Sequence, residues 1–407
     1  MKRKLALILS LVMCISLCTP VFAIDTSSDI RAYSSQASIL EMTIDELSLA
    51  NANNSELTGT LNAAQQNYSQ LCSYVANPSI LEQFSVYDLE TITDVIATNS
   101  LSRSQAANLI NSWHTSESYS PSIDIKYAKI HAAQQENKIS YDEITTNLSR
   151  AYSGGITSVG SGDLTGVHYM VRSTSGGFNK ASGTIELPTV TLRSSANDPD
   201  VPYVMFGFYV GSDLGFDLGA CYMQSDGKWH FFISGYVSSS EGGYTKFYKE
   251  MSDTFSPNSL LSVNLVARIA RGSNSDVLYL TAIDTSSWTE IDTIDVDTGT
   301  TGFTPDFSGY KAGADRSYVS STYGNVYVNR EVTLAHESQS GRTLTGTTIE
   351  DAEWSAVYLY TTSGYNLWGT SQTQSARKIG ETLDYANTVN VSITNKWYQD
   401  TTDIYYR

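Results

Sequence analysis

Residues 203–236 read YVMFGFYVGSDLGFDLGACYMQSDGKWHFFISGY and decide the fold class of this chain. Three apolar runs, at 203–210, 217–223 and 228–236, are separated by the turn sequences GSDLG and SDG. Each run has the length of a strand, is rich in β-branched and aromatic residues, and is bounded by Gly, Asp or Ser. The stretch therefore predicts three consecutive antiparallel strands in the inner part of a β-sandwich.

Side chains alternate between the two faces of a strand, so the third run can be divided into two sides. Trp229, Phe231 and Ile233 make one side wholly apolar, and we expect that side to face the core between two sheets. The other side mixes polar and aromatic residues, which is typical of the lining of a ligand groove. His230 and Tyr236 lie on that side, and matching of neighbouring strands adds Tyr209 from the first run and Asp217 from the second as candidate binding residues.

Two of these candidates have a second interpretation. Asp217 fits an acid that accepts hydrogen bonds from backbone amides at the start of a strand. His230 fits a partly buried histidine whose hydrogen bonds are satisfied by its neighbours. Both interpretations are open from the sequence.

The strand pattern continues from about 159 to 337. Short strand-like runs and turn signals recur there at the spacing of roughly 8 to 12 residues that is typical of an all-β sandwich. The last segment, 342–407, holds further strand-like runs. It either completes the sandwich or forms a small β appendage, and the appendage is the arrangement we expect.

The region 37–150 has a helical period instead. Capping-box sequences, TIDE at 43–46 and SYDE at 140–143, each open an apolar repeat of three to four residues. Asn-Pro and Ser/Pro breaks divide the region into separate helices. We therefore predict a small α-helical domain before the sandwich, with a linker near Gly154 that limited proteolysis should cut between about residues 149 and 162.

The first 23 residues, MKRKLALILSLVMCISLCTPVFA, have the features of a secretory signal peptide: a basic start, an apolar run and a small residue at the end. The apolar run is shorter than the roughly 20 residues that a membrane span needs. We expect cleavage after Ala23, a flexible arm over 24–36, and a secreted protein with no membrane attachment after cleavage. N-terminal sequencing of the mature protein should begin at Ile24.

Charge and cysteine content exclude several classes of protein. The formal net charge is −17, and the signal carries three positive residues and no acid, so the mature chain is near −20. Such a charge disfavours nucleic acid and anionic membranes as partners. The mature chain keeps Cys72 and Cys221, which excludes a disulfide-rich scaffold and leaves one bond between them open.

Three short motifs, GFDLGACY at 215–222, DGKWHFF at 226–232 and YKAGAD at 310–315, resemble strands of the concanavalin A-like lectin and glucanase superfamily. Within it they are most similar to the YrpD-like secreted bacterial proteins. The resemblance covers about 160–336 and implies a jelly-roll β-sandwich whose concave sheet forms a glycan groove in members that bind sugars. It implies no activity, because the YrpD-like group has none that can be carried over.

Two enzyme branches of that superfamily carry strand motifs that can be compared with this chain. Laminarinase-type hydrolases place two carboxylates about 5 Å apart on one face. The segment EIDTID resembles their strand and offers Glu290, Asp292 and Asp295 as catalytic candidates, although Asp295 stands where the branch has a Glu. The same acids fit an exposed hairpin strand. Alginate lyases carry Y-x-K-A-G-x-Y, and Asp315 replaces its second Tyr.

Other catalytic and metal motifs are missing or incomplete. The chain has no G-x-S-x-G, no H-E-x-x-H and no Walker loop. His114 and His131 lack the spacing of metal ligands. NDPD at 197–200 and DVDTG at 295–299 are oxygen-rich but lack the spaced bidentate Glu of a calcium loop. The sequence thus predicts no cofactor. A structural calcium ion at one of these oxygen-rich segments is the alternative that stays open.

Export, composition and resemblance together lead to an expected function. We expect a secreted bacterial lectin-like protein that binds an extracellular polysaccharide or cell-wall glycan, without catalysis. One alternative is a glycan-degrading enzyme of the same fold, a glycoside hydrolase or polysaccharide lyase, and another is a structural or adhesive envelope protein. A binder needs aromatic platforms and a few polar groups, whereas an enzyme also needs a pair of acid and base groups in the groove.

Overall fold

A computed structural model of the chain describes residues 36–113, 152, 154–160, 166–174, 177–194, 200–210, 214–237, 244–256, 261–271, 276–297, 326–336, 345–361 and 364–406. The expected signal peptide and nearly all of the expected arm lie outside these ranges. So do His114, His131, the capping-box sequence at 140–143 and the motif at 310–315. What the sequence predicts for these segments stays a prediction.

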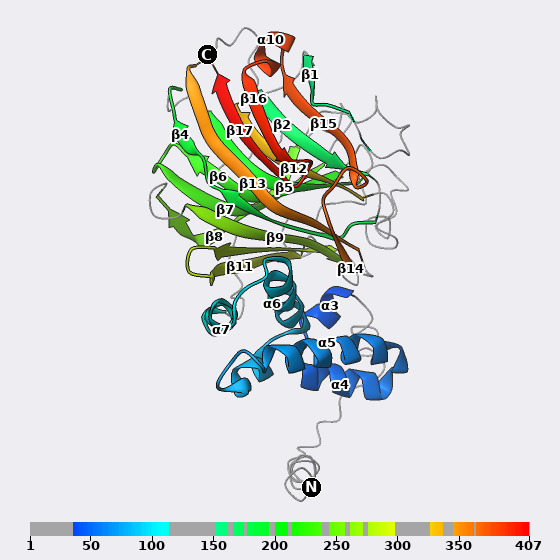
Figure 1. The fold of residues 1–407 in the computed structure, drawn as a ribbon. Helices are drawn as coiled ribbons and strands as arrows, with labels where there is room; N and C mark the ends of the chain where they lie inside the picture. The colour runs from blue at the N-terminus through cyan, green and yellow to red at the C-terminus, as the bar shows by residue number, and fades with distance from the viewer. Residues whose placement is uncertain are drawn as a thin grey trace, which may run out of the picture.

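Two large sheets make up most of the described chain (Figure 1). The first, called the β5 sheet below, has the strand order β1 (Thr157–Gly160), β15 (Thr373–Gly380), β2 (Gly166–Ser173), β12 (Val326–Ala335), β5 (Val201–Val210), β6 (Leu214–Met223), β7 (Lys228–Val237), β8 (Tyr244–Phe255). The second, called the β13 sheet, has the order β11 (Thr289–Asp297), β10 (Asp276–Asp284), β9 (Ser262–Arg271), β3 (Lys180–Glu186), β13 (Thr347–Thr361), β17 (Gln399–Tyr406), β16 (Val389–Asn395). Two short strands, β4 (Thr189–Thr191) and β14 (Gly364–Leu367), pair with β13.

The mainly β fold and its central meander are confirmed. Strands β5, β6 and β7 are consecutive antiparallel neighbours, and Asp217 on β6 lies opposite Gly207 on β5 and Ser234 on β7. The apolar side of β7 lies in the core between the sheets, where Trp229, Phe231 and Ile233 are buried. Local alternation was sufficient for this prediction, because consecutive strands pair through short turns.

The C-terminal segment supplies strands to both sheets. β13 lies in the middle of its sheet, paired with β3 on one side and β17 on the other. β15 pairs with β2 in the opposite sheet. The segment therefore completes the sandwich, and the appendage that we expected from the sequence is not what the structure has. The pairing of β13 with β3 joins segments far apart in the chain, which local patterns do not reveal.

A buried ion pair crosses the core. The guanidinium of Arg330 on β12 donates from Nη1 and Nη2 to the two carboxylate oxygens of Asp400 on β17, at 2.8 and 2.7 Å. Nη2 also donates to the carbonyl of Trp397, and Tyr169 on β2 donates its hydroxyl to Asp400 at 2.8 Å. All of these side chains are buried, so the network ties the two sheets together through charge-assisted hydrogen bonds.

Five α-helices and two short 3₁₀-helices occupy the described N-terminal part: α3 (Gln36–Leu40), α4 (Ile44–Asn53), η1 (Ser55–Leu57), α5 (Thr58–Leu71), η2 (Pro78–Gln83), α6 (Val86–Thr98), α7 (Arg103–Ser112). The capping box predicted at 43–46 is present, with Thr43 and Glu46 bonded to each other's backbone amides. The apolar faces of α6 and α7 are buried. A further short helix, α10 (Leu383–Ala386), lies between β15 and β16.

These helices cover part of the outer face of the β13 sheet, next to β9 and β11 (Figure 1). Val266 and Ile283 from the sheet belong to the same apolar cluster as the core of α6 and α7. Tyr87 on α6 stacks on Tyr279 on β10 with ring centroids 4.5 Å apart, and its hydroxyl hydrogen-bonds to Thr281 at 3.0 Å. The helices thus share buried apolar surface with the sandwich.

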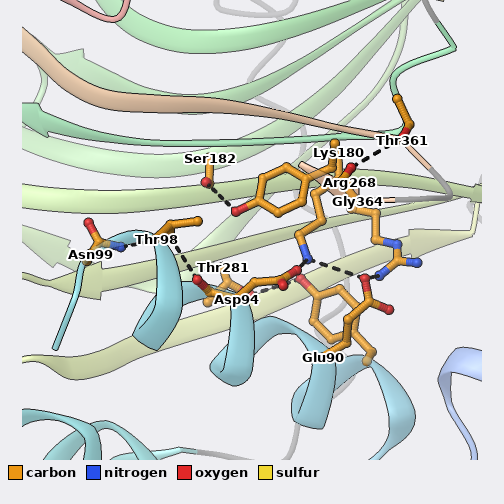
Figure 2. Close-up of polar contacts among 12 residues, drawn as sticks. Glu90, Asp94, Thr98, Asn99, Lys180, Ser182, Arg268, Thr281, Thr361 and Gly364 are labelled. Atoms are coloured by element: carbon orange, nitrogen blue, oxygen red, sulfur yellow. Dashed lines mark hydrogen bonds and ion pairs between the residues drawn. The ribbon is translucent and has the colours of Figure 1, made fainter. Parts of the chain in front are cut away.

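Ion pairs reinforce this contact, as Figure 2 shows. Glu90 on α6 lies 2.9 Å from Arg268 on β9 and 3.4 Å from Lys180 on β3, and Asp94 also pairs with Lys180. Burial opposes the ionisation of Glu90, but the positive charges of Arg268 and Lys180 outweigh it and lower the pKa of Glu90 to about 2. The carboxylate therefore stays ionised over the physiological pH range.

Cys72, at the end of α5, is partly exposed. Cys221 is buried on β6 of the β5 sheet. Both are free thiols, so the bond that the sequence left open does not form. None of the helices in the described part of the chain combines the length and the apolar character that crossing a membrane requires.

Candidate functional site

The face of the β5 sheet that points away from the core carries a line of polar side chains. Consecutive register partners on β2, β12, β5, β6 and β7 form this line, which we call the polar row: Arg172, Asn329, Gly207, Asp217 and Ser234. Gly207, Asp217 and Ser234 belong to the consecutive strands of the meander, whereas Arg172 and Asn329 join them because β2 and β12 pair over long range. The row lies on the face where the sequence predicted a ligand groove.

Hydrogen bonds connect one end of the row to a second set of polar groups. Arg172 donates from Nε to Asn329 at 2.9 Å, and Asn329 donates to Glu331 at 3.1 Å. The other oxygen of Glu331 accepts from Thr333 at 3.3 Å and lies 3.7 Å from Nδ1 of His168. A guanidinium, an amide, a carboxylate, a hydroxyl and an imidazole therefore converge on one face of β2 and β12.

Tyr209 lies flat over the middle of the row. A Cβ atom at Gly207 or Gly215 would come within 2.5 or 2.7 Å of its ring, so both glycines are needed for the ring to lie there. The hydroxyl donates to Asp217 at 2.8 Å. Burial raises the pKa of Tyr209, and the negative charges of Asp217 and Glu331 raise it further, which keeps the phenol a donor.

Aromatic rings also hold the cation of the row. The guanidinium carbon of Arg172 is 5.6 Å from the ring centroid of Tyr209 and 5.3 Å from that of Tyr327. Arg172 thus lies against two rings while its Nε bonds to Asn329. Contacts of this kind orient the planar guanidinium and restrict its motion.

His230 lies at another part of the same sheet. His230 on β7 lies opposite Cys221 on β6. It is four residues from Ser234, which lies opposite Asp217. Its Nδ1 is 3.0 Å from Glu250, and its Nε2 is 3.0 Å from Asp226. Burial lowers the pKa of His230, but the hydrogen bonds and charges of Glu250 and Asp226 outweigh it and raise the pKa.

The contribution of His230 to stability should therefore depend on pH. The folded pKa is above the value of about 6.5 for an unfolded histidine, so the stabilisation is complete below that pH and is lost as pH rises through the raised pKa. Replacing His230 by Gln should lower the melting temperature more at about pH 5.5 than at about pH 9. Calorimetry with Lys228→Gln as control tests this, and equal losses at both pH values would contradict it.

The structure brings together only some of the residues that the sequence predicted. Tyr209 and Asp217 contact each other, and His230 forms a separate cluster with carboxylates. Tyr236 on β7 lies opposite Gly215 on β6, and nothing is described of its side chain. Tyr209 and Asp217 are 0% exposed, so these two do not line an open groove. Alternation identified the face correctly but carries no information about what buries it.

The catalytic candidates lie elsewhere, on the edge strand β11 of the other sheet. A bulge makes Asp292 pair with Ala282, which lies in the sandwich core, and Glu290 with Ile283, which packs against the helices. Since paired residues share a face, Glu290 and Asp292 point to opposite faces of the sheet. Glu290 is buried and accepts a hydrogen bond from Thr293 at 2.6 Å. The arrangement does not match the paired carboxylates of a retaining hydrolase.

Asp295, the third catalytic candidate, accepts a hydrogen bond at its backbone carbonyl from Lys249 on β8. It follows Ile294, which is in the core, so its side chain points to the helix-covered face. The side chain is partly exposed. These observations fit a residue on an edge strand.

Sequence reasoning missed five residues of the site: Arg172, Asn329, Glu331, Thr333 and His168. A signal was present in NVYVNREVTLAH, where Tyr327, Asn329, Glu331 and Thr333 recur at every second position, and GVHYMVRS places His168 and Arg172 on one side of its strand. Arg330 hides the pattern in NVYVNREVTLAH, because it is a charged residue on the core side.

No group of three or more His, Cys, Asp or Glu side chains in the described ranges is placed to hold a metal ion. Of the oxygen-rich segment at 197–200, the structure describes Asp200, which accepts from Thr345 and Thr347, each at 2.5 Å. Of the segment at 295–299, residues 298 and 299 lie outside the described ranges. Structural calcium at either segment stays a hypothesis.

No protein-family model and no curated protein matches the chain. Solved structures that are similar include two of scytalido-glutamic peptidase, one with a peptide-based transition-state analog (9% identity, TM-score 0.34) and one with a transition-state analog inhibitor (8% identity, TM-score 0.35). Another is SCP-B, a member of the eqolisin family of peptidases, in complex with the tripeptide Ala-Ile-His (9% identity, TM-score 0.30). Each covers 59% of this chain and 98% of the other chain. At these identities and TM-scores, nothing about the activity of this chain follows from the likeness.

Proposed function

We propose that this chain is a secreted lectin-like protein that binds an extracellular or cell-wall glycan through the polar face of the β5 sheet, without catalysis. The sandwich is proposed to be a jelly roll of the concanavalin A-like kind. The observation that carries the proposal is the polar row, where Arg172, Asn329 and Asp217 lie beside the flat ring of Tyr209.

The chemistry of the row suits a sugar. Sugar hydroxyls donate and accept hydrogen bonds in pairs, and amide, carboxylate and guanidinium groups offer both roles. The ring of Tyr209 offers an apolar face of the kind that stacks on a sugar ring. Burying charged groups is costly even when they are paired, whereas apolar side chains pack without that cost. The concentration of such groups on one face supports a binding role.

The row is closed to solvent: Asn329 and Asp217 are buried, as is Arg172. Binding there therefore includes a conformational change that opens this face before a glycan can reach it. Such a change gives slow association, since ligand binds only the fraction of molecules that are open. His230, which is partly exposed, lies toward the more accessible part of the same sheet.

A second candidate function is a glycan-degrading enzyme of the same fold. Glu331 lies 3.7 Å from His168 and shares its face with Asp217, so a carboxylate, an imidazole and a second carboxylate are available on one side of the sheet. Clusters of buried ionisable groups are common at catalytic sites. Turnover of a polysaccharide that is abolished by Glu331→Gln, with the melting temperature retained, would favour this function.

The test is a glycan array run beside assays for reducing sugars and for unsaturated products, on neutral and uronate polysaccharides. Asn329→Ala should weaken binding by about tenfold, since a lost hydrogen bond to a ligand costs about 1 to 2 kcal/mol. Tyr209→Phe, which removes only the hydroxyl, should weaken it less. Asn390→Ala, on an exposed position of β16 in the other sheet, is the matched control.

Binding without turnover, weakened by Asn329→Ala and unchanged by Asn390→Ala, is the result we expect. Circular dichroism and melting curves must show that each variant folds. If no glycan binds, or if Asn329→Ala binds as the wild type does, the polar row is not a lectin site. The structural or adhesive alternative would then be favoured.

A further inference from the structure

The helices in the described part of the chain cover one side of the outer face of the β13 sheet. The helices contact β9, β10, β11 and β3, through the clusters described above and the ion pairs in Figure 2. The helical layer ends beside β13, where the hydroxyl of Tyr358 donates to the carbonyl of Thr98 at the end of α6. Beyond this point, β16 and β17 carry partly or fully exposed polar side chains on the same face.

A cluster of tyrosines lies at this boundary. Tyr358 pairs with Leu367 and Tyr360 with Tyr365 across β13 and β14, so all four side chains share one face. The ring of Tyr365 is 5.7 Å from that of Tyr358 and 5.5 Å from that of Tyr360. Tyr360 is buried, its hydroxyl is hydrogen-bonded to that of Ser182, and the ammonium of Lys180 lies over its ring. In contrast, Tyr365 is 43% exposed and Leu367 is 37% exposed. Buried neighbours thus hold an exposed ring in place.

A chain of hydrogen-bonding groups follows on the same face. Gln399 on β17 donates to Glu353 on β13 at 3.2 Å, and Asn395 donates to Gln399 at 2.7 Å. Glu353 points outward because its neighbour Trp354 is in the core. Burial raises the pKa of Tyr358, and the phenol groups of Tyr365 and Tyr398 raise it further, which places Tyr398 near the cluster. Amide and carboxylate groups therefore lie on the same outward face of the β13 sheet as the rings.

Charge favours one kind of ligand at this surface. The carboxylate of Glu353 and a formal net charge of −17 for the chain disfavour polyanions. Nearby cations have other partners: Lys180 pairs with Asp94, and the ammonium of Lys396 is 5.4 Å from the ring centroid of Trp397. Uncharged hydroxyl groups can bond to the amides and to the carboxylate at once. The surface suits a chain of neutral sugars.

We propose that Tyr358, Tyr365, Glu353, Gln399 and Asn395 form a second carbohydrate site, which we call the tyrosine platform, and that its ligand is a neutral polysaccharide. Tyr365 stacks on a sugar ring while the amides and Glu353 bond to hydroxyl groups of the same or the next sugar. The platform lies on the opposite sheet from the polar row and needs no opening, because Tyr365 and Asn395 are already exposed.

Affinity electrophoresis in gels that contain xylan, mannan, β-glucan or polygalacturonate tests the platform. The wild type should be retarded by at least one neutral polymer and not by polygalacturonate. Tyr365→Ala should weaken that binding by about tenfold, Tyr365→Phe should retain most of it, and Gln399→Ala should weaken it without changing the melting temperature. Leu383→Ala removes an exposed apolar side chain of α10 and is the control for non-specific adsorption.

The same experiment with Asn329→Ala and Tyr365→Ala tests the polar row and the tyrosine platform independently of each other. If Asn329→Ala weakens binding and Tyr365→Ala does not, the platform is not a site and the polar row stands. If Tyr365→Ala alone weakens binding to a neutral polymer, the platform stands and the polar row falls. Retardation by polygalacturonate alone, or by no polymer, overturns the platform.

Discussion

Replacing Asp400 by Ala is expected to lower the free energy of unfolding by about 3 to 5 kcal/mol, the cost of removing one partner from a buried ion pair. Asp400 accepts both hydrogen bonds of the Arg330 fork and that of Tyr169, and it is buried in the core. The guanidinium would be left buried without its counter-charge. Urea denaturation followed by tryptophan fluorescence measures the effect.

Two further variants separate charge from packing. Asp403→Ala, on the outward side of the same strand, removes a single hydrogen bond with the amide of Asp351 and should cost less than about 1 kcal/mol. The double variant Arg330→Met/Asp400→Leu should recover most of the loss, since apolar residues of similar volume can replace a buried ion pair. A loss of less than about 1 kcal/mol in Asp400→Ala would mean that the ion pair does not hold the sheets together.

The double variant Glu90→Gln/Asp94→Asn is expected to lower the free energy of unfolding by about 3 kcal/mol and to loosen the helices from the β13 sheet. Lys180 and Arg268 are both buried and would lose these carboxylate partners (Figure 2). The partial exposure of Glu90 and Asp94 makes the cost smaller than that for Asp400. Urea denaturation with limited proteolysis of the helical region tests the prediction.

The pH dependence of Glu90→Gln gives an independent check. The folded pKa of Glu90, about 2, is below its ordinary value of 4.5. The stabilisation is therefore present above about pH 4.5 and is lost as pH falls toward 2. The difference between this variant and the wild type should shrink over that interval. Exposed Glu56→Gln is the control, and an unchanged difference between about pH 3 and pH 7 would contradict the role given to Glu90.

Local features of the fold could be predicted from the sequence because local rules decide them. The meander around Asp217, the apolar side of β7 and the capping box at Thr43 depend on neighbours along the chain or across a short turn. The position of β13 depends on pairing with β3, a strand more than 150 residues earlier, and no periodicity encodes that choice. The appendage predicted for 342–407 was wrong for this reason.

In the candidate site, too, contacts within the meander could be predicted and contacts that depend on long-range strand pairing could not. Tyr209 and Asp217 could be found because they belong to adjacent strands of one meander. Arg172 and Asn329 lie on β2 and β12, whose pairing is long-range, so their 2.9 Å contact could not be foreseen. Glu290 and Asp292 were candidates because EIDTID resembles a hydrolase strand with its carboxylates on one face, and the bulge in β11 puts them on opposite faces.

Hydrogen exchange with and without a bound glycan tests the lectin proposal most directly. Oligosaccharide at saturation should slow exchange in peptides that cover β2, β12, β5 and β6, which carry the polar row. At an oligosaccharide concentration near the wild-type dissociation constant, Asn329→Ala should remove most of that protection while leaving the protection of peptides from β13 and β14 unchanged. Protection confined to β13, β14 and β17, or absent from the whole chain at a saturating glycan concentration, would contradict binding through the polar row.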